Sequence, residues 1–234
     1  PTMCAHYEPV TDRERYRVGF GVEPPTDVGQ AELWPGYAGS FIRRPRPQDH
    51  AGCPPAMEAI AGIFGLIPHW AKDQTISRRT YNARSETVAE KPSYRDAWRL
   101  GRRCIIPAEA FYEPDWRSGK AVPTRIARAD KRPMGIAGIW MGWKAPDGSI
   151  VRSYSMLTIN ADQHAFMQQF HKPQDEKRMV VILPEARYHD WLLASPQQSR
   201  DFLLPWPAAE LASTQVQAVE QHGAHLADGV GRLI

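Results

Sequence analysis

The chain has 234 residues, which is enough for one large domain or two small ones with a substantial buried core. Hydrophobic residues make up 42% and charged residues 24% of the chain, which is an ordinary globular composition and excludes intrinsic disorder. The net charge of +3 excludes a strongly polybasic nucleic-acid binder but leaves room for a local basic groove.

The first part of the chain is the least regular. Residues 23–58 are rich in proline, with Pro35-Gly36 among several turn-forming pairs, and this composition predicts a long loop. Residues 61–67 are apolar and predict a strand. Asn82 is a good N-cap for a short helix that ends near Pro92.

Strands dominate the middle of the chain. A second short helix is predicted at residues 93–100, with Gly101 just past its end. The runs that predict strands are residues 103–106, 110–112, 124–128, 135–143, 150–160 and 179–183. Pro146-Asp147-Gly148 predicts a hairpin turn between two of these strands.

Further helices are predicted at residues 162–170, 186–193 and 197–203, and the tail after them is poorly patterned. Successive hairpins with helices between them favour the α+β class. The expected architecture is an antiparallel or mixed β-sheet with a barrel-like core and peripheral helix pairs. No break in the pattern demands a second domain, so residues 1–234 are expected to form a single domain.

The three cysteines are Cys4, Cys53 and Cys104, and their spacing argues against a disulfide framework or a structural zinc site. A reduced, cytoplasmic protein is therefore expected. No apolar run approaches the roughly 18 residues that a transmembrane helix needs, and no signal peptide is visible.

Cys4 has two interpretations. It is either a small, half-buried hydrophobic residue or an N-terminal nucleophile exposed by removal of Met3. In the second case its amine would have a pKa of about 7.7–8.0 and its thiol a pKa of about 8.5. Both groups would then react close to neutral pH.

Two further clusters are each open to a structural and a functional interpretation. Asn82, Arg84 and Glu86 form either a helix cap followed by exposed charges or an anion site suited to a phosphate. Glu113 is either a solvent-exposed glutamate at a strand end or a carboxylate walled by aromatic side chains. Apolar walls raise a carboxyl pKa and suit it to proton transfer. His171 follows a predicted helix, and its position alone gives it no role.

Several blocks of the chain, in this order, resemble the SRAP (SOS response-associated peptidase) family. Met3-Cys4 resembles the family's start, where methionine is removed and cysteine becomes the first residue. The most specific blocks are NARSETVAEKP at 82–92 and RCIIPAEAFYE at 103–113. FGLIPHWA at 64–71, GIW at 138–140 and His171 with RMVVIL at 178–183 also match, so the resemblance is clearest over residues 3–184.

The resemblance implies a DNA-damage response protein that binds single-stranded DNA and crosslinks covalently to abasic sites. The amine of Cys4 would form a Schiff base with the sugar aldehyde, and its thiol would close a thiazolidine ring. Glu113 would manage protons, His171 would assist sugar ring opening, and Asn82 would orient the reacting groups. The implied DNA contacts are Arg84 at a phosphate, Trp70 as a stacking surface with a core position as its alternative, Pro35, Arg43 and Arg178.

The chain departs from the family pattern in several places. His6 stands where the family has an arginine that contacts DNA. Residues 172–177, KPQDEK, lengthen the gap between the histidine and the Arg-Met pair. Val180 replaces the usual proline, and the family's motifs are not recognisable at 33–36 and 219–223.

The expected partner is single-stranded DNA with abasic sites, without cofactor, metal or membrane, and the protein is expected to be a cytoplasmic monomer associated with the nucleoid when it acts. Two alternatives remain open: a cysteine-type peptidase that removes its own leader, and a non-catalytic homologue that only binds single strands. Met3 is expected to be the true start and Pro1-Thr2 an expression or processing remnant. While these residues precede Cys4, its nitrogen is an amide that cannot form the adduct.

Overall fold

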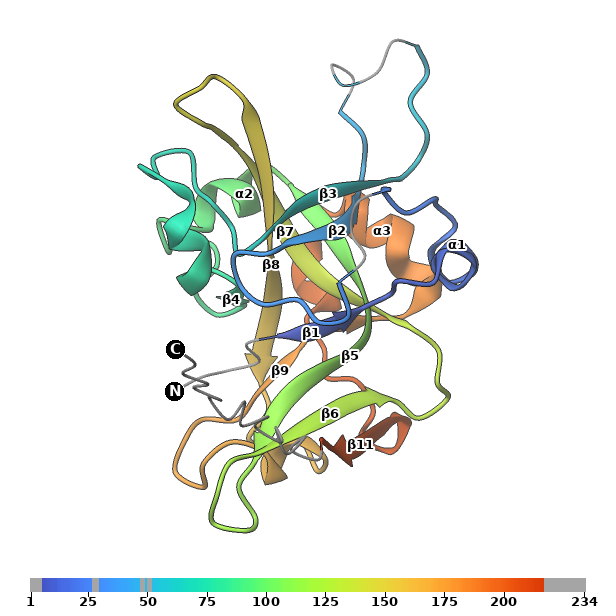
Figure 1. Ribbon diagram of the computed structural model, residues 1–234, viewed down its shortest axis with the longest axis vertical. Helices are drawn as coiled ribbons and strands as arrows, with labels where there is room; N and C mark the ends of the chain where they lie inside the picture. The colour runs from blue at the N-terminus through green and yellow to red at the C-terminus, as the bar shows by residue number, and fades with distance from the viewer. Residues whose placement is uncertain (1–5, 27–29, 47–48, 50–51, 217–234) are drawn as a thin grey trace, which may run out of the picture.

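A computed structural model describes residues 6–26, 30–46, 49 and 52–216 of the chain (Figure 1). The strands in these ranges are β1 (Tyr7–Pro9), β2 (Ala38–Arg43), β3 (Glu58–Phe64), β4 (Asn82–Arg84), β5 (Arg103–Asp115), β6 (Val122–Arg128), β7 (Met134–Lys144), β8 (Ile150–Asn160), β9 (Arg178–Val180), β10 (Ile182–Leu183) and β11 (Leu211–Gln215). The α-helices are α1 (Arg13–Phe20), α2 (Arg95–Arg99) and α3 (Tyr188–Leu193). The 3₁₀ helices are η2 (Gln74–Arg79), η3 (Met167–Gln169), η4 (Glu185–Arg187), η5 (Gln198–Phe202) and η6 (Ala208–Glu210).

Five strands close into a barrel. The pairings run from β2 to β3, from β3 to β8, from β8 to β7, from β7 to β5 and from β5 back to β2. The pair β3–β8 is parallel and the other four are antiparallel, so the sheet is mixed. Short helices flank the barrel, with α2 on one side and α1 and α3 on the other in Figure 1. The α+β class and the barrel-like core are confirmed.

The long strand β5 connects the barrel to the candidate site. Its first half, from Arg103 to Ala108, pairs with β7 inside the barrel. Its second half pairs with β6 on one edge and with β1 on the other. Buried Phe111 and Ile126 pair across β5 and β6 and anchor this extension. Glu113 therefore lies near the end of a strand that is fixed along its whole length.

Most predicted strands are confirmed with shifted bounds. The strand predicted at 61–67 is β3, which ends at Phe64 because Gly65 leaves the extended conformation with a φ of 106°. The runs 103–106 and 110–112 form one continuous strand, β5, whereas the run 179–183 is divided into β9 and β10. The hairpin turn is confirmed by a 2.9 Å hydrogen bond from the Ala145 N–H to the Ser149 carbonyl.

The helix predicted to begin at Asn82 is wrong. Asn82–Arg84 forms β4, which pairs in parallel with Met156–Thr158 of β8. Residues 85–92 then make isolated turns, such as the 3.1 Å hydrogen bond from the Thr87 N–H to the Arg84 carbonyl. The capping signal is local, and pairing with a strand more than 70 residues away outweighs it.

Two other predictions are wrong. The loop predicted at 23–58 contains β2, which pairs with both β3 and β5. The helix predicted at 162–170 is reduced to the 3₁₀ helix η3, and the His164 Nδ1 accepts the Met167 N–H at 3.1 Å at its start. The poorly patterned tail contains β11, which pairs with β6.

The helices predicted at 93–100, 186–193 and 197–203 are confirmed as α2, as η4 with α3, and as the 3₁₀ helix η5. Within the described ranges, no helix is long and apolar enough to cross a lipid bilayer.

Gly65 is required where β3 ends, which gives a first testable prediction. Its φ of 106° disfavours any residue with a Cβ, and a Cβ placed there would lie 1.9 Å from the backbone oxygen of Ser77. Gly65→Ala is expected to lower the free energy of unfolding by more than ~2 kcal/mol in urea denaturation. Gly148→Ala is the matched control, because its φ of 88° carries strain but nothing lies within 4 Å of its Cβ. Equal losses from both variants would contradict the expected clash.

Candidate functional site

A buried acid–imidazole pair lies at the end of β5. The Nε2 atom of His171 is 3.4 Å from the Oε2 atom of Glu113. Only 6% of His171 and 2% of Glu113 are exposed. The structure thus brings together two residues that are 58 positions apart and were predicted to be catalytic.

The backbone of His171 is fixed by the strand that carries Glu113. Its N–H donates a 2.9 Å hydrogen bond to the Pro114 carbonyl, and the neighbouring Phe170 forms an isolated bridge with Asp115. His171 has a φ of 62°, in the left-handed region that non-glycine residues rarely adopt. The contacts with β5 hold this strained backbone and aim the imidazole at the Glu113 carboxylate.

Burial lowers the pKa of His171 below its ordinary value of 6.5, because the imidazolium form loses hydration. A hydrogen bond with the Arg178 backbone and the charge of Asp175 oppose this shift, whereas the charge of Lys177 adds to it. The net effect is a neutral imidazole at neutral pH. A neutral imidazole next to a carboxyl group is suited to accepting and returning a proton.

Asn82 and Arg84 project from β4 on the same side of the strand, because they are two residues apart. The Asn82 side chain is buried, and its backbone carbonyl accepts a 3.0 Å hydrogen bond from the Tyr94 hydroxyl. Arg84 is more open, with 42% of its side chain exposed. The strand therefore carries a buried amide and a partly exposed guanidinium on one side.

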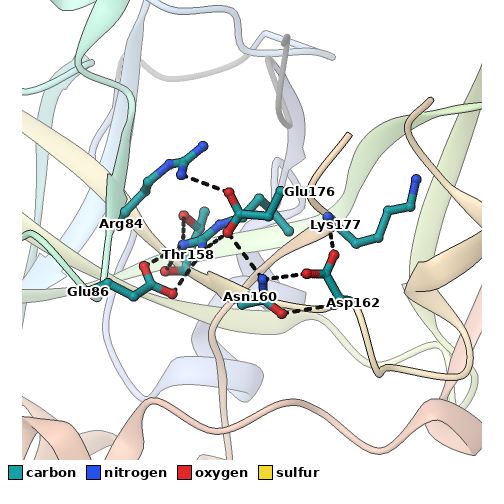
Figure 2. Close-up of polar contacts among 8 residues, drawn as sticks. Arg84, Glu86, Thr158, Asn160, Asp162, Glu176 and Lys177 are labelled. Atoms are coloured by element: carbon teal, nitrogen blue, oxygen red, sulfur yellow. Dashed lines mark hydrogen bonds and ion pairs between the residues drawn. The ribbon is translucent and has the colours of Figure 1, made fainter. Parts of the chain in front are cut away.

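A second cluster of charged side chains includes Arg84, Glu86 and Glu176 (Figure 2). The Arg178 guanidinium donates two 2.9 Å hydrogen bonds to Glu86 and a 2.8 Å hydrogen bond to Glu176. It also donates to the Thr158 carbonyl at 2.8 Å. Glu176 reaches a second arginine, since its other oxygen lies 2.8 Å from Nη1 of Arg84. Arg84 and Arg178, both predicted to contact DNA, are thus joined through one carboxylate.

The acidic partners in this cluster are held in their charged forms. Burial raises the pKa of Glu176, but hydrogen bonds from Arg178 and Asn160 more than offset it, and the net pKa is lowered. Burial acts on Glu86 in the same way, and Arg178 again lowers the net pKa. Arg178 is itself buried, with 1% of its side chain exposed. The position of Arg178 suits the organisation of the site better than direct contact with a ligand.

His6 lies in an aromatic stack that the sequence did not predict. Its ring stacks on Trp34 at 4.0 Å and on Tyr112 at 4.2 Å, between centroids. Its backbone carbonyl accepts a 3.3 Å hydrogen bond from the Tyr112 N–H. Burial lowers the pKa of His6, and the nearby Glu32 carboxylate partly opposes the shift. This stack places the start of the described chain beside the residue that precedes Glu113.

Trp70 and Pro35, two further predicted DNA contacts, lie on separate segments of the chain. Trp70 is 48% exposed, so its alternative assignment to the core is wrong. Its Nε1 donates a 3.3 Å hydrogen bond to the Pro92 carbonyl, at the end of the segment that begins with Asn82. Pro35 is half-buried beside Trp34 of the stack.

Arg43 does not join the site. It lies opposite Cys104 at the start of β5, at the other end of that strand from Glu113. Its buried guanidinium pairs with Asp49 and, at 2.8 Å, with Glu58, and it covers the Trp140 ring at 4.4 Å from the centroid. These contacts give Arg43 a structural role at this end of the barrel.

Cys4 lies outside the described residues. In the sequence it stands two positions before His6. The other two cysteines are Cys53, which is exposed, and Cys104, which is buried in the barrel.

Comparisons with known proteins agree on one family. A sequence model described as "SOS response associated peptidase (SRAP)" matches residues 3–221. The chain is 35% identical over 162 residues to "Abasic site processing protein YoaM" of Bacillus subtilis, covering 67% of each chain. It is 28% identical over 127 residues to "Abasic site processing protein HMCES" of Mus musculus, covering 42% of this chain and 36% of that one.

A solved structure agrees with the fold. The crystal structure of a protein from Bordetella bronchiseptica is 45% identical and superimposes with a TM-score of 0.81, covering 92% of this chain and 100% of that chain. A protein from Bacteroides thetaiotaomicron, 21% identical with a TM-score of 0.72, shares the fold over 92% of this chain and 93% of its own.

Proposed function

The chain belongs to the SOS response associated peptidase (SRAP) family, and from that premise we propose that it processes abasic sites by crosslinking to them through Cys4. The relatives that carry the name abasic site processing protein support this assignment. The observation that carries the proposal is the buried pair of Glu113 and His171, 3.4 Å apart beside the stack that contains His6. In the sequence, Cys4 stands two positions before His6 of that stack.

The proposed reaction uses both nucleophiles of an N-terminal cysteine. The free amine of Cys4 attacks the C1′ aldehyde of the ring-opened abasic sugar, and loss of one water gives a Schiff base. The thiol sulfur then adds to the imine carbon, its proton passes to the nitrogen, and a five-membered thiazolidine closes. The second step is intramolecular and is therefore favoured entropically.

Glu113 and His171 serve the proton transfers in this scheme. Glu113 takes a proton from the amine and returns one to the departing hydroxyl of the carbinolamine. His171, neutral because burial lowers its pKa, accepts the sugar hydroxyl proton as the ring opens. The buried amide of Asn82 orients the sugar on the other side of the site.

The DNA strand is proposed to pass over the exposed residues at the rim. Arg84 is the partly exposed arginine and is assigned a flanking phosphate. Trp70 offers an exposed ring face for a base. Arg178, which is buried, positions Glu86 and His171 and does not contact the strand.

The test is incubation of protein that begins at Cys4 with a single-stranded oligonucleotide containing one abasic site. A species that survives denaturing electrophoresis is expected, and the same strand with thymidine at that position should give none. The absence of such a species from protein with a free Cys4 amine would overturn the proposal. Release of a leader peptide as the sole reaction would favour the peptidase alternative instead.

Trp70→Ala tests the stacking surface. We expect it to weaken binding of undamaged single-stranded DNA by ~1–3 kcal/mol, because a base loses its stacking partner. Stability should change little, since about half of the Trp70 side chain is exposed. Fluorescence anisotropy with a labelled oligothymidine measures the binding, and Trp70→Phe should retain most of it. Unchanged binding by Trp70→Ala would remove Trp70 from the DNA path.

A further inference from the structure

Glu176 lies between the two arginines of the site. One carboxylate oxygen accepts from Arg178 at 2.8 Å. The other accepts from Arg84 at 2.8 Å (Figure 2). Two arginines therefore share one carboxylate in the geometry with which guanidinium groups also hold a phosphate. Glu176 belongs to residues 172–177, which lengthen the chain between His171 and Arg178.

The segment that carries Glu176 is held in place by the end of β8. The Lys177 N–H donates a 2.7 Å hydrogen bond to the Asp162 carboxylate. The side-chain amide of Asn160 donates to Asp162 at 2.8 Å and to Glu176 at 3.2 Å. Glu176 is therefore presented to the arginines by a defined turn.

The two ion pairs of Glu176 differ in how easily they can be exchanged. Arg178 is buried and bound by Glu86 through two hydrogen bonds, so it keeps a carboxylate partner without Glu176. Arg84 and Glu176 are 42% and 36% exposed, and ion pairs at such exposure are weak and screened by salt. The link between Glu176 and Arg84 is thus the one that an incoming anion can replace.

We propose that Glu176 occupies the place of a DNA phosphate at Arg84 in the free protein and limits the affinity for single-stranded DNA. This inference rests on the proposed function, because it takes Arg84 as the phosphate contact. A phosphate that approaches Arg84 must displace the carboxylate, and the two negative charges repel each other while both are near. Removing the charge of Glu176 leaves Arg84 available and removes the repulsion.

The test is the affinity of Glu176→Gln for a labelled oligothymidine that contains no abasic site. At low salt we expect binding about fivefold tighter or more than that of the unaltered protein. The logarithmic salt dependence should steepen by about 0.7, as for one additional phosphate contact on a single strand. Glu176→Ala, which cannot retain the hydrogen bonds, should behave in the same way.

Two matched variants make the result specific. Glu90→Gln removes the same charge from an exposed position outside these ion pairs and should change the affinity less than about twofold. Arg84→Gln should cancel the effect, so that Glu176→Gln gains nothing in that background. Unchanged or weaker binding by Glu176→Gln, or a gain that persists without Arg84, would overturn the proposal.

Failure of this inference differs from failure of the proposed function. If the unaltered protein forms the abasic-site adduct but Glu176→Gln gains no affinity, only the role of Glu176 is rejected. If Glu176→Gln gains affinity and no adduct forms with a free Cys4 amine, the crosslinking function is rejected and Glu176 stands as a competitor of DNA phosphate. If the protein binds no single strands, both are rejected.

Discussion

Cys4→Ala is expected to abolish the covalent adduct between the protein and an abasic-site oligonucleotide. Alanine keeps the N-terminal amine but has no thiol, so any Schiff base stays open to hydrolysis and no thiazolidine closes. Denaturing electrophoresis after incubation without a reductant measures the loss. Cys53→Ala is the matched control, because Cys53 is an exposed free cysteine outside the site, and it should crosslink like the unaltered protein.

Blocking the amine of Cys4 tests the other nucleophile of the same reaction. Protein in which residues 1–3 remain attached should give no adduct, because the Cys4 nitrogen is then an amide. Single-stranded DNA binding should persist in both this protein and Cys4→Ala. Equal adduct yields with and without the three residues would show that the amine is not the nucleophile.

Glu113→Gln and His171→Gln are expected to slow adduct formation by roughly 10²–10⁴-fold each, the usual contribution of a positioned proton-transfer group. Quenched-flow or manual time courses at saturating DNA measure the rate. The affinity for undamaged DNA should change little, since both side chains are buried. His189→Gln, on the exposed surface of α3, is the control for the histidine substitution and should leave the rate unchanged.

The pair should also act as a unit. Because the two side chains lie 3.4 Å apart, the double variant should be little slower than the worse single variant. Additive rate losses in the double variant would contradict a shared role of Glu113 and His171.

The lowered pKa of His171 predicts how the rate depends on pH. As pH falls, the rate advantage of the unaltered protein over His171→Gln should persist below pH 6.5, the ordinary imidazole value, and disappear only when the buried imidazole is protonated. A loss of the rate advantage already above pH 6.5 would contradict the lowered pKa of His171.

The prediction of a strand leading to Glu113 is confirmed because its signal is local. The aromatic, apolar run at 110–112 favours a strand, and β5 contains that run and continues through Glu113 to Asp115. The prediction of a helix at Asn82 failed because its determinant is remote: β4 exists through parallel pairing with β8, which a capping pattern cannot reveal. The side of the strand on which Asn82 and Arg84 lie follows from that pairing.

The contacts among the charged residues around Arg178 are a second feature that the sequence could not predict. Arg84 and Glu86 come from one stretch of the chain and Glu176 and Arg178 from another, and their contacts depend on β4 and β9 both pairing with β8. The lengthened segment 172–177 was visible in the sequence, but its placement of Glu176 on both arginines was not. The left-handed backbone of His171 was equally unpredictable, because contacts with Pro114 and Asp115 of β5 impose it.

The most direct test of the account is the intact mass of the product formed by protein beginning at Cys4 and an abasic-site oligonucleotide. We expect the mass of the product to equal the summed masses of the two reactants less one water, and we expect fragmentation to place the link on Cys4. Either no covalent product from such protein, or a link mapped to a different residue, would contradict it.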